Sequence, residues 1–358
     1  MKKYLTALAF FPKITYTRHK NLLQHFTDPA DIWQAELEDL LEAKLEENII
    51  YEFLKWRDLQ PPEYFTNLLA QKNIYTLSVN EPGYPRLLKE INDPPHTLFV
   101  RGNLKDINTA VAIVGTRQLS SYGRQACLDI VSPLAQKGIT IVSGLALGID
   151  GLAHEATLQA GGKTVAVLGG SVEKNYIYPS AHNNLAEKII ESGGALVSEY
   201  PPGFLPTVYS FPARNRIIAG LCLGTLVIEA PVKSGSLITA YAALDYNREV
   251  FSVPHNITSA SGEGCNKLLK LGAHVTLTAN DILEALDLKI TNEEIKEKTK
   301  LQLNEQEAVI YKTLSREPKH INQIIKETGL TSQEAGGTIT MLEIRGIVKD
   351  VGGKMYVI

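Results

Sequence analysis

The sequence of 358 residues is poor in cysteine, has no excess of positive charge and contains no long hydrophobic run. Its cysteines, Cys127, Cys222 and Cys265, form no Cys-x-x-Cys pair and no even disulfide framework. This pattern favours a cytoplasmic location and argues against a zinc site. The net charge of −3 argues against a uniformly basic coat for nucleic acid. Any polyanion must therefore be bound by positive charge gathered in one groove.

The apolar runs are too short to cross a membrane, since none reaches the length of about 18 residues that a spanning helix needs. The run from Tyr4 to Phe11 imitates the start of a signal peptide. Pro12 and Lys13 end this run, and no small-residue cleavage site follows it. We therefore expect a buried first helix and no membrane partner.

The chain length and the order of its patterns predict three domains. Residues 1–72 are typical of a small domain of short helices, and residues 73–288 of an α/β domain. Residues 289–302 are charged and poor in large apolar groups, which indicates a linker. Residues 303–358 predict a small winged helix-turn-helix domain whose hairpin turns at Gly352-Gly353.

The middle domain alternates short β-rich runs with amphipathic segments of helix length. Such alternation predicts an α/β fold with an extended Rossmann-like, doubly wound parallel sheet. The runs are continuously apolar, as expected when helices cover both faces of the sheet. The predicted strands, which follow a strand-like Thr97–Val100, are Ala110–Val114, Ile139–Val142, Thr164–Leu168, Ala195–Ser198, Thr225–Ile228, Val250–Val253 and Val275–Leu277.

Loops rich in small residues follow several predicted strands, at the edge where an open parallel sheet binds its ligands. Glycine and serine let backbone N–H groups approach a phosphate, and the cations of Arg117 and Lys233 add charge-assisted hydrogen bonds. Alternatively, a glycine in any one loop serves only the geometry of its turn. The loops are Gly115-Thr116-Arg117, Ser143-Gly144 through Asp150, Gly169-Gly170-Ser171 with Lys174 downstream, and Lys233-Ser234-Gly235-Ser236.

A predicted helix opens at Pro212 and carries Arg214, Asn215 and Arg216 in its first turns. Cations at this end oppose the helix dipole, so they are expected to have an anionic partner. That partner is either a bound phosphate or a structural carboxylate such as Glu199 or Glu229. Base stacking is predicted for an aromatic residue nearby, the alternative being that these rings are simply packed. The aromatic candidates are Tyr176, Tyr178 and Phe211.

Motifs for nucleotide, dinucleotide and metal chemistry are incomplete. Gly162-Lys163-Thr164 resembles the end of a phosphate-binding loop, but Thr157 stands where the earlier glycine is needed. The first βα turn lacks the Gly-x-Gly-x-x-Gly fingerprint, and His154-Glu155 lacks a second histidine at position 158. We expect no cofactor, no metal and no catalytic residue set, and hence a protein that is not an enzyme.

Several long motifs occur in the order in which one protein family carries them. Together they closely resemble the DNA-processing protein A family, also called Smf, densely over residues 80–285. The C-terminal winged helix is similar to a module that many members carry, and residues 1–72 loosely resemble the family's sterile-alpha-motif-like or helix-hairpin-helix module. The motifs are Ala112–Arg117, Ser143–Asp150 with Ala153-His154, Ser198–Gly203, Phe211–Leu221 and Glu229-Ala230 with Lys233–Ala240.

This resemblance implies a protein of natural transformation that binds and protects incoming single-stranded DNA and loads the RecA recombinase. It also implies homodimerisation through the Rossmann-like domain. The family resemblance places the strand in a positive pocket at Gly115-Thr116-Arg117. The sequence departs from the family before Tyr178-Pro179, where the longer Gly169–Ile177 lacks the usual aspartate, and this puts a role for Lys174 in doubt.

Two other functions are compatible with parts of the pattern. A nucleotide 5′-monophosphate hydrolase of the lysine-decarboxylase-like type also has a Rossmann-like core, and Glu229 would be its catalytic carboxylate. However, the Pro-Gly-Gly-x-Gly-Thr loop of that family is missing at Ala219–Thr225. A transcription regulator built on the winged helix is weaker, because Thr331–Arg345 carries Glu334 and Glu343 but only Arg345 as a cation. A protein-binding role suits that module better.

Overall fold

The computed structural model describes residues 2–105, 107–288, 304–315, 318–344 and 347–357. The chain divides into two compact units, residues 1–290 and 291–358. The predicted linker 289–302 lies outside the described residues. In the described part of the chain, no helix is both long and apolar enough to cross a membrane.

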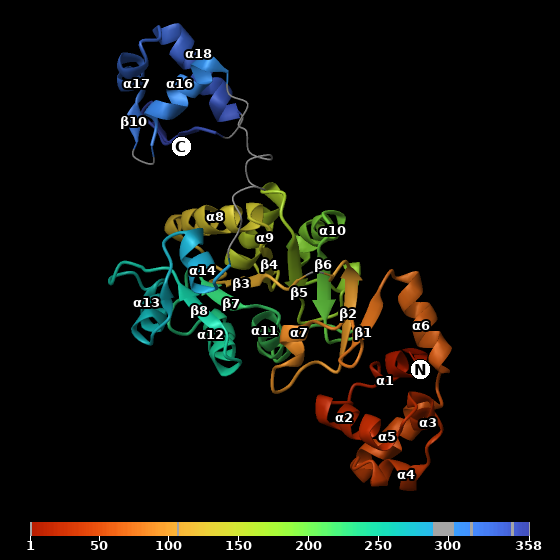
Figure 1. Ribbon diagram of the computed structural model, residues 1–358. Helices are drawn as coiled ribbons and strands as arrows, with labels where there is room; N and C mark the ends of the chain where they lie inside the picture. Colours follow the sequence, from red (N-terminus) through yellow and green to blue (C-terminus); the bar gives the residue numbers. More distant parts are fainter. Residues whose placement is uncertain (1, 106, 289–303, 316–317, 345–346, 358) are drawn as a thin grey trace. The chain divides into compact units, whose positions relative to one another are not determined.

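The first unit is built on a nine-stranded sheet in the order β1-β2-β6-β5-β4-β3-β7-β8-β9 (Figure 1). Strands from β6 to β9 along this order pair in parallel, whereas β2 pairs antiparallel with both β1 and β6. The predicted doubly wound α/β fold is therefore confirmed. The strands are β1 (Tyr75–Ser78), β2 (Thr97–Gly102), β3 (Ala110–Val114), β4 (Thr140–Ser143), β5 (Thr164–Val167), β6 (Ala195–Ser198), β7 (Gly224–Val227), β8 (Glu249–Ser252) and β9 (His274–Val275).

Helices cover both faces of the sheet, which explains why the central strands β3 to β7 are buried throughout. One face packs against α7, α11, α12 and α13, and the other against α8, α9, α10 and α14. The helices are α7 (Arg86–Lys89), α8 (Ser121–Gln136), α9 (Ile149–Gln159), α10 (Asn183–Glu191), α11 (Ser210–Gly220), α12 (Ser236–Asp245), α13 (Glu263–Lys270) and α14 (Ala279–Ala285), with 3₁₀ turns η1 (Lys174–Tyr176) and η2 (Ser180–His182).

Short helices precede the sheet and have an apolar core of their own, centred on Leu22, Ile50 and Phe53. The same region also packs on the sheet, since the ring of Phe10 lies edge-on to that of Phe99 in β2 at 5.5 Å. These helices and the sheet thus belong to one compact unit. They are α1 (Lys2–Leu8), α2 (Tyr16–His25), α3 (Pro29–Gln34), α4 (Leu37–Glu42), α5 (Glu47–Arg57) and α6 (Pro62–Gln71).

The second unit has the predicted winged-helix organisation. Its helices pack around Ile310, Ile324 and Ile339, and a three-stranded sheet of order β10-β12-β11 forms the wing. Gly329 ends the second helix with a left-handed φ of 70°, which glycine adopts without strain. The elements are α16 (Glu305–Thr313), α17 (Ile321–Thr328), α18 (Ser332–Ile344), β10 (Lys319–His320), β11 (Lys349–Asp350) and β12 (Met355–Val357).

Candidate functional site

The chain order of the strands reverses between β3 and β7, which lie side by side with Val114 opposite Val227. In doubly wound sheets, the loops at such a switch point diverge and leave a crevice for a ligand. The loop after β3 begins at Gly115, where an added Cβ would lie 2.5 Å from the side chain of Ile149. The backbone N–H of Thr116 donates to the carbonyl of Glu229 at 2.7 Å. These contacts fix the direction in which the chain presents Arg117.

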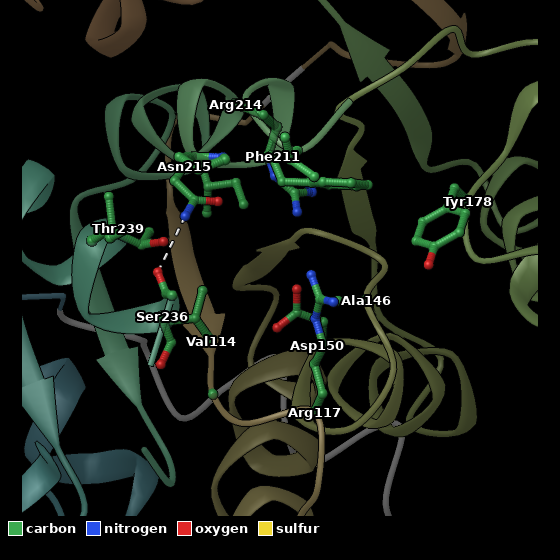
Figure 2. A pocket seen from close by; sticks show the side chains of 16 residues that line it. Val114, Arg117, Ala146, Asp150, Tyr178, Phe211, Arg214, Asn215, Ser236 and Thr239 are labelled. Atoms are coloured by element: carbon green, nitrogen blue, oxygen red, sulfur yellow. Dashed lines mark hydrogen bonds between the residues drawn. The ribbon is translucent and has the colours of Figure 1, made fainter. Parts of the chain in front are cut away.

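A pocket of about 400 Å³ opens at this switch point (Figure 2). Its walls come from the loops after β3, β4, β5, β6 and β7 and from α11 and the first turn of α12. Of the predicted loops, those after β3, β4 and β7 contribute to these walls, whereas Gly169-Gly170-Ser171 with Lys174 does not. The lining residues are Val114, Gly115, Arg117, Ala146, Asp150, Tyr178, Val208, Phe211, Pro212, Arg214, Asn215, Ile218, Gly235, Ser236, Ile238 and Thr239.

Arg117 is the exposed cation of this pocket. Its guanidinium carbon lies 5.9 Å from the centre of the Phe211 ring, and that ring in turn packs against Tyr178 at 5.5 Å. Within the described ranges, Arg117 forms no ion pair with a carboxylate. Tyr178 is 55% exposed, so a second aromatic face is also open to a ligand. A guanidinium beside aromatic rings is suited to hold a phosphate together with an adjacent planar group.

Arg214 points into the same pocket but is only 5% exposed. Its Nη1 donates to the carbonyl of Gly144 at 2.6 Å and also to the carbonyl of Val167. A Cβ at Gly144 would overlap this guanidinium, so the position requires glycine. Arg214 thereby ties α11 to the loop after β4 and to the end of β5. Its first function is to hold the pocket wall.

The carboxylate of Asp150 balances the buried charge of Arg214. Its Oδ2 accepts the backbone N–H of Gly144 at 3.1 Å. Burial raises the pKa of Asp150, and the positive charge of Arg214 opposes that rise. Burial likewise lowers the pKa of Arg214 to about 10, Asp150 raises it again, and the nearby positive charge of Arg117 lowers it. The pocket floor is therefore close to neutral, and the charge that faces the opening is that of Arg117.

The loop after β7 supplies polar groups on the opposite wall. Asn215 Nδ2 donates to the carbonyl of Gly235 at 3.2 Å, which joins this loop to α11. The hydroxyl oxygens of Ser234 and Ser236 lie 2.7 Å apart, and the backbone N–H of Ser236 donates to Ser234 Oγ. Gly235 and Ser236 line the pocket at the first turn of α12.

Seven predicted site residues do not line this pocket: Thr116, Ser143, Gly144, Lys174, Arg216, Lys233 and Ser234. Ser143 is fully buried, and its hydroxyl donates to the carbonyl of Ile113 at 2.6 Å. Lys174, in η1, and Lys233 are exposed but do not line it. Arg216 lines a different pocket, because residues two apart on a helix point to different sides. Its Nη2 donates to Glu199 at 2.5 Å, which is the structural salt bridge considered above as the alternative to a phosphate.

Glu229, the catalytic carboxylate of the hydrolase hypothesis, is fully buried and does not line the pocket. Its Oε2 accepts the backbone N–H of Ser120, at the start of α8, at 2.9 Å. Its Oε1 accepts the hydroxyl of Ser261 at 2.5 Å. Both carboxylate oxygens therefore accept hydrogen bonds from neighbouring segments of the chain. Glu229 consequently gives the hydrolase hypothesis no support.

Sequence reasoning gave no role to several contributors to the pocket, among them Asp150 and Val208. Asp150 was part of a glycine-bearing loop but received no role, although a carboxylate in the first turn of a buried helix is a recognisable signal. Val208, which is 76% exposed, belongs to a loop that carried no motif. In the described residues, no cluster of histidine, cysteine and carboxylate groups could hold a metal ion.

The sheet and the switch-point pocket define a Rossmann-like α/β protein with a candidate ligand site at the carboxyl edge of the sheet. The family model for DNA recombination-mediator protein A matches residues 75–287, and the model for the DprA winged helix domain matches residues 294–354. The chain belongs to the DNA recombination-mediator protein A family.

Relatives support this membership over nearly the whole chain. The protein Smf of Synechocystis sp. is 35% identical, and the alignment covers 94% of this chain and 94% of that protein. The Smf protein of Escherichia coli is 45% identical over 61% of this chain and 58% of its own length. The crystal structure of DNA processing protein A from Streptococcus pneumoniae has a TM-score of 0.67 and 32% identity, and the match covers 79% of this chain and 98% of that one.

A structure of DNA processing protein A from Helicobacter pylori, described for its unique single-stranded DNA binding mode, is also similar. It has a TM-score of 0.53 and 31% identity, and the match covers 60% of this chain and 95% of that chain. The fold and the family are thus shared with a protein that binds single-stranded DNA.

Proposed function

We propose that this protein binds single-stranded DNA in the switch-point pocket, with Arg117 holding a phosphate. The observation that carries the proposal is an exposed guanidinium, free of carboxylate partners in the described residues, beside the rings of Phe211 and Tyr178. A single strand offers unpaired base faces for stacking on such rings, whereas a duplex hides them. The Helicobacter pylori relative supports the same ligand.

The proposed contacts at this site are narrower than the set predicted from sequence. Arg117 supplies the full charge, and the backbone N–H groups of Gly115 and of Gly235, at the start of α12, supply directional donors. Asn215 borders the same opening. Lys233, which is exposed on the adjoining loop, supplies a more distant positive charge.

In the cell, we propose that this binding serves natural transformation. The protein would protect incoming single strands in the cytoplasm and load the RecA recombinase on them, without acting as an enzyme. Three features of the chain agree with this role: family membership, a site suited to a flexible polyanion and buried unpaired cysteines. The winged helix is proposed to bind a protein, since α18 carries no lysine or arginine in its described range.

The test of the DNA-binding proposal is a titration of matched single- and double-stranded oligonucleotides at several salt concentrations. We expect tighter binding of the single strand, and a logarithmic affinity that falls by about 0.7 per logarithm of salt for each neutralised phosphate. Equal affinity for the duplex, or no dependence on salt, would contradict a site that combines stacking with phosphate contacts.

We further propose a homodimer through the Rossmann-like domain, at the free edge beyond β9. Large apolar residues are exposed there: Leu271 is 63%, Val275 55% and Leu277 65% exposed. Apolar surface at a sheet edge is normally covered by a partner. Light scattering is expected to give twice the chain mass of 39.4 kDa for the wild type and the single mass for Leu277→Glu. A wild-type mass of one chain rejects the dimer.

A further inference from the structure

A second pocket, of about 260 Å³, lies between the N-terminal helices and the sheet, away from the switch point. Segments from four parts of the chain form it: the end of α1 with the start of α2, the turn before β2, the loop after β6, and α11. Its lining residues are Ala9, Phe11, Pro12, Ile14, Thr15, Tyr16, Asp93, Pro94, Pro95, His96, Thr97, Glu199, Tyr200, Pro201, Phe204 and Arg216.

The polar wall of this second pocket contains buried hydrogen-bonding atoms that are unsatisfied within the described residues. Arg216 donates from Nη2 to Glu199 Oε2, and its Nε lies 3.6 Å from Asp93. This leaves Glu199 Oε1 and Arg216 Nη1 buried, each without a hydrogen-bond partner among the residues that the structure describes. An acceptor and a donor on adjacent side chains are thus both unsatisfied, and buried polar groups in folded proteins rarely remain so.

The charges of this wall select among ligand classes. Two carboxylates, Asp93 and Glu199, face one guanidinium, that of Arg216, so an anion is repelled. A cation would satisfy Glu199 Oε1 but leave Arg216 Nη1 without an acceptor. A neutral group that carries a donor beside an acceptor satisfies both atoms.

The remaining walls are suited to a flat ring. Tyr200 and Phe204 are stacked in parallel, with ring centres 4.2 Å apart and an interplanar angle of 8°. Proline rings and Tyr16 complete an apolar enclosure. A neutral planar ring with adjacent donor and acceptor atoms is the chemistry of a nucleobase edge and face.

The two pockets are connected by the chain itself. Helix α11 presents Arg214 to the first pocket and Arg216 to the second. The loop before this helix runs from Phe204, in the second pocket, to Val208, in the first. Between and beside them Leu205 is 67% exposed and Tyr209 is 82% exposed. Exposed apolar side chains along this loop provide a surface on which unpaired bases can lie.

We propose that the second pocket receives one unpaired base of the same DNA strand that Arg117 holds, and that the strand crosses the loop from Phe204 to Tyr209 between the two. This inference rests on the proposed function and adds a base subsite to it. It accounts for the unsatisfied atoms of Glu199 and Arg216, and for the apolar surface between the pockets.

The test compares the full-length protein with variants on single strands of increasing length, from about 4 to about 16 nucleotides, the range of sizes that single-strand sites occupy. Wild-type affinity is expected to increase in a step at the length that reaches the second pocket. Phe204→Ala removes one stacked ring, so it is expected to abolish the step and to weaken binding of long strands by about 5-fold to 100-fold. Binding of the shortest strands stays unchanged.

A second variant tests the proposal independently, in case Phe204→Ala does not fold. Leu205→Asp places a carboxylate on the exposed loop, where it repels the phosphates of a crossing strand, and is expected to weaken only long strands. Leu59→Asp, at a side chain that is 71% exposed and lines neither pocket, is the matched control. Wild-type affinity for long strands in both Phe204→Ala and Leu205→Asp would overturn the proposal.

Two further outcomes distinguish failure of the base subsite from failure of the proposed DNA-binding function. If Arg117→Ala leaves binding of every length unchanged, the proposed function fails, and the subsite fails with it. If nucleoside monophosphates bind the wild type but not Phe204→Ala, while long strands bind both equally, the pocket serves free nucleotides, and the strand path is rejected.

Discussion

Replacement of Arg117 by alanine is expected to weaken single-strand binding by about 10-fold to 100-fold. The physical reason is the loss of charge-assisted hydrogen bonds to a phosphate, which contribute about 1.5–3 kcal/mol each. The salt dependence should also flatten, by about 0.7 in its logarithmic slope if one phosphate contact disappears. Fluorescence anisotropy at several salt concentrations measures both effects in one series.

The controls for this variant separate charge from geometry. Arg117→Lys keeps the positive charge but loses the planar fork, so it should keep the salt slope while recovering only part of the affinity. Arg86→Ala removes a guanidinium that is 81% exposed and lines neither pocket, and it should bind as the wild type does. If Arg117→Ala keeps the wild-type affinity and salt slope, single-stranded DNA does not bind in the switch-point pocket.

Replacement of Arg214 by methionine is expected to lower the free energy of unfolding by about 3 kcal/mol near neutral pH. The variant leaves the buried carboxylate of Asp150 without its balancing charge, and removing one member of a buried pair is strongly destabilising. It also deprives the carbonyls of Gly144 and Val167 of their donor. Denaturant unfolding followed by circular dichroism measures the loss.

The loss should depend on pH with a definite sign. Because the pKa of Asp150 is raised in the folded state, this group favours folding at low pH. Its contribution is lost as the pH rises from the unfolded value of about 3.9 through the raised folded value. Arg214 opposes that rise in the wild type, so the folded pKa of Asp150 is higher still in Arg214→Met. The deficit of the variant should therefore grow as the pH rises above the folded pKa of the wild type, and be smallest below it.

A double variant checks the assignment. Asp150→Asn combined with Arg214→Met removes both buried charges, so it should recover part of the lost stability, and its deficit should no longer change with pH. A single variant Arg214→Met that unfolds with the wild-type free energy would show that the guanidinium does not hold the pocket wall.

Much of the fold could be predicted from sequence because the central strands are buried on both faces. Continuous apolar runs such as Ala110–Val114 coincide with β3, and Ala195–Ser198 coincides with β6. Strand β1 was missed, because the first strand-like run identified in the sequence was Thr97–Val100. Its residues Tyr75–Ser78 form a short edge strand of mixed exposure, so the local hydrophobic pattern is too weak to predict a strand there. Its pairing with β2 is a tertiary contact.

The candidate site was predictable in its location but not in the roles of its arginines. Glycine-bearing loops after parallel strands must meet at one edge, so the grouping of Gly115, Arg117 and Gly235 followed from topology. Arg214 and Arg216 differ in role because packing sets the rotation of α11 about its axis. That rotation buries one arginine in the pocket wall and pairs the other with Glu199. Local sequence does not contain this information.

The neighbouring positions of β3 and β7 have a consequence for how the protein is made. The strands pair although more than a hundred residues of chain separate them, and the first turn of α12 closes the same opening. A nascent chain on the ribosome therefore has no complete site until Thr239 has emerged from the exit tunnel. Strands β3 to β7 are therefore all synthesised before the switch-point pocket can bind a ligand. A fragment of the chain that ends before α12 lacks one wall of this pocket.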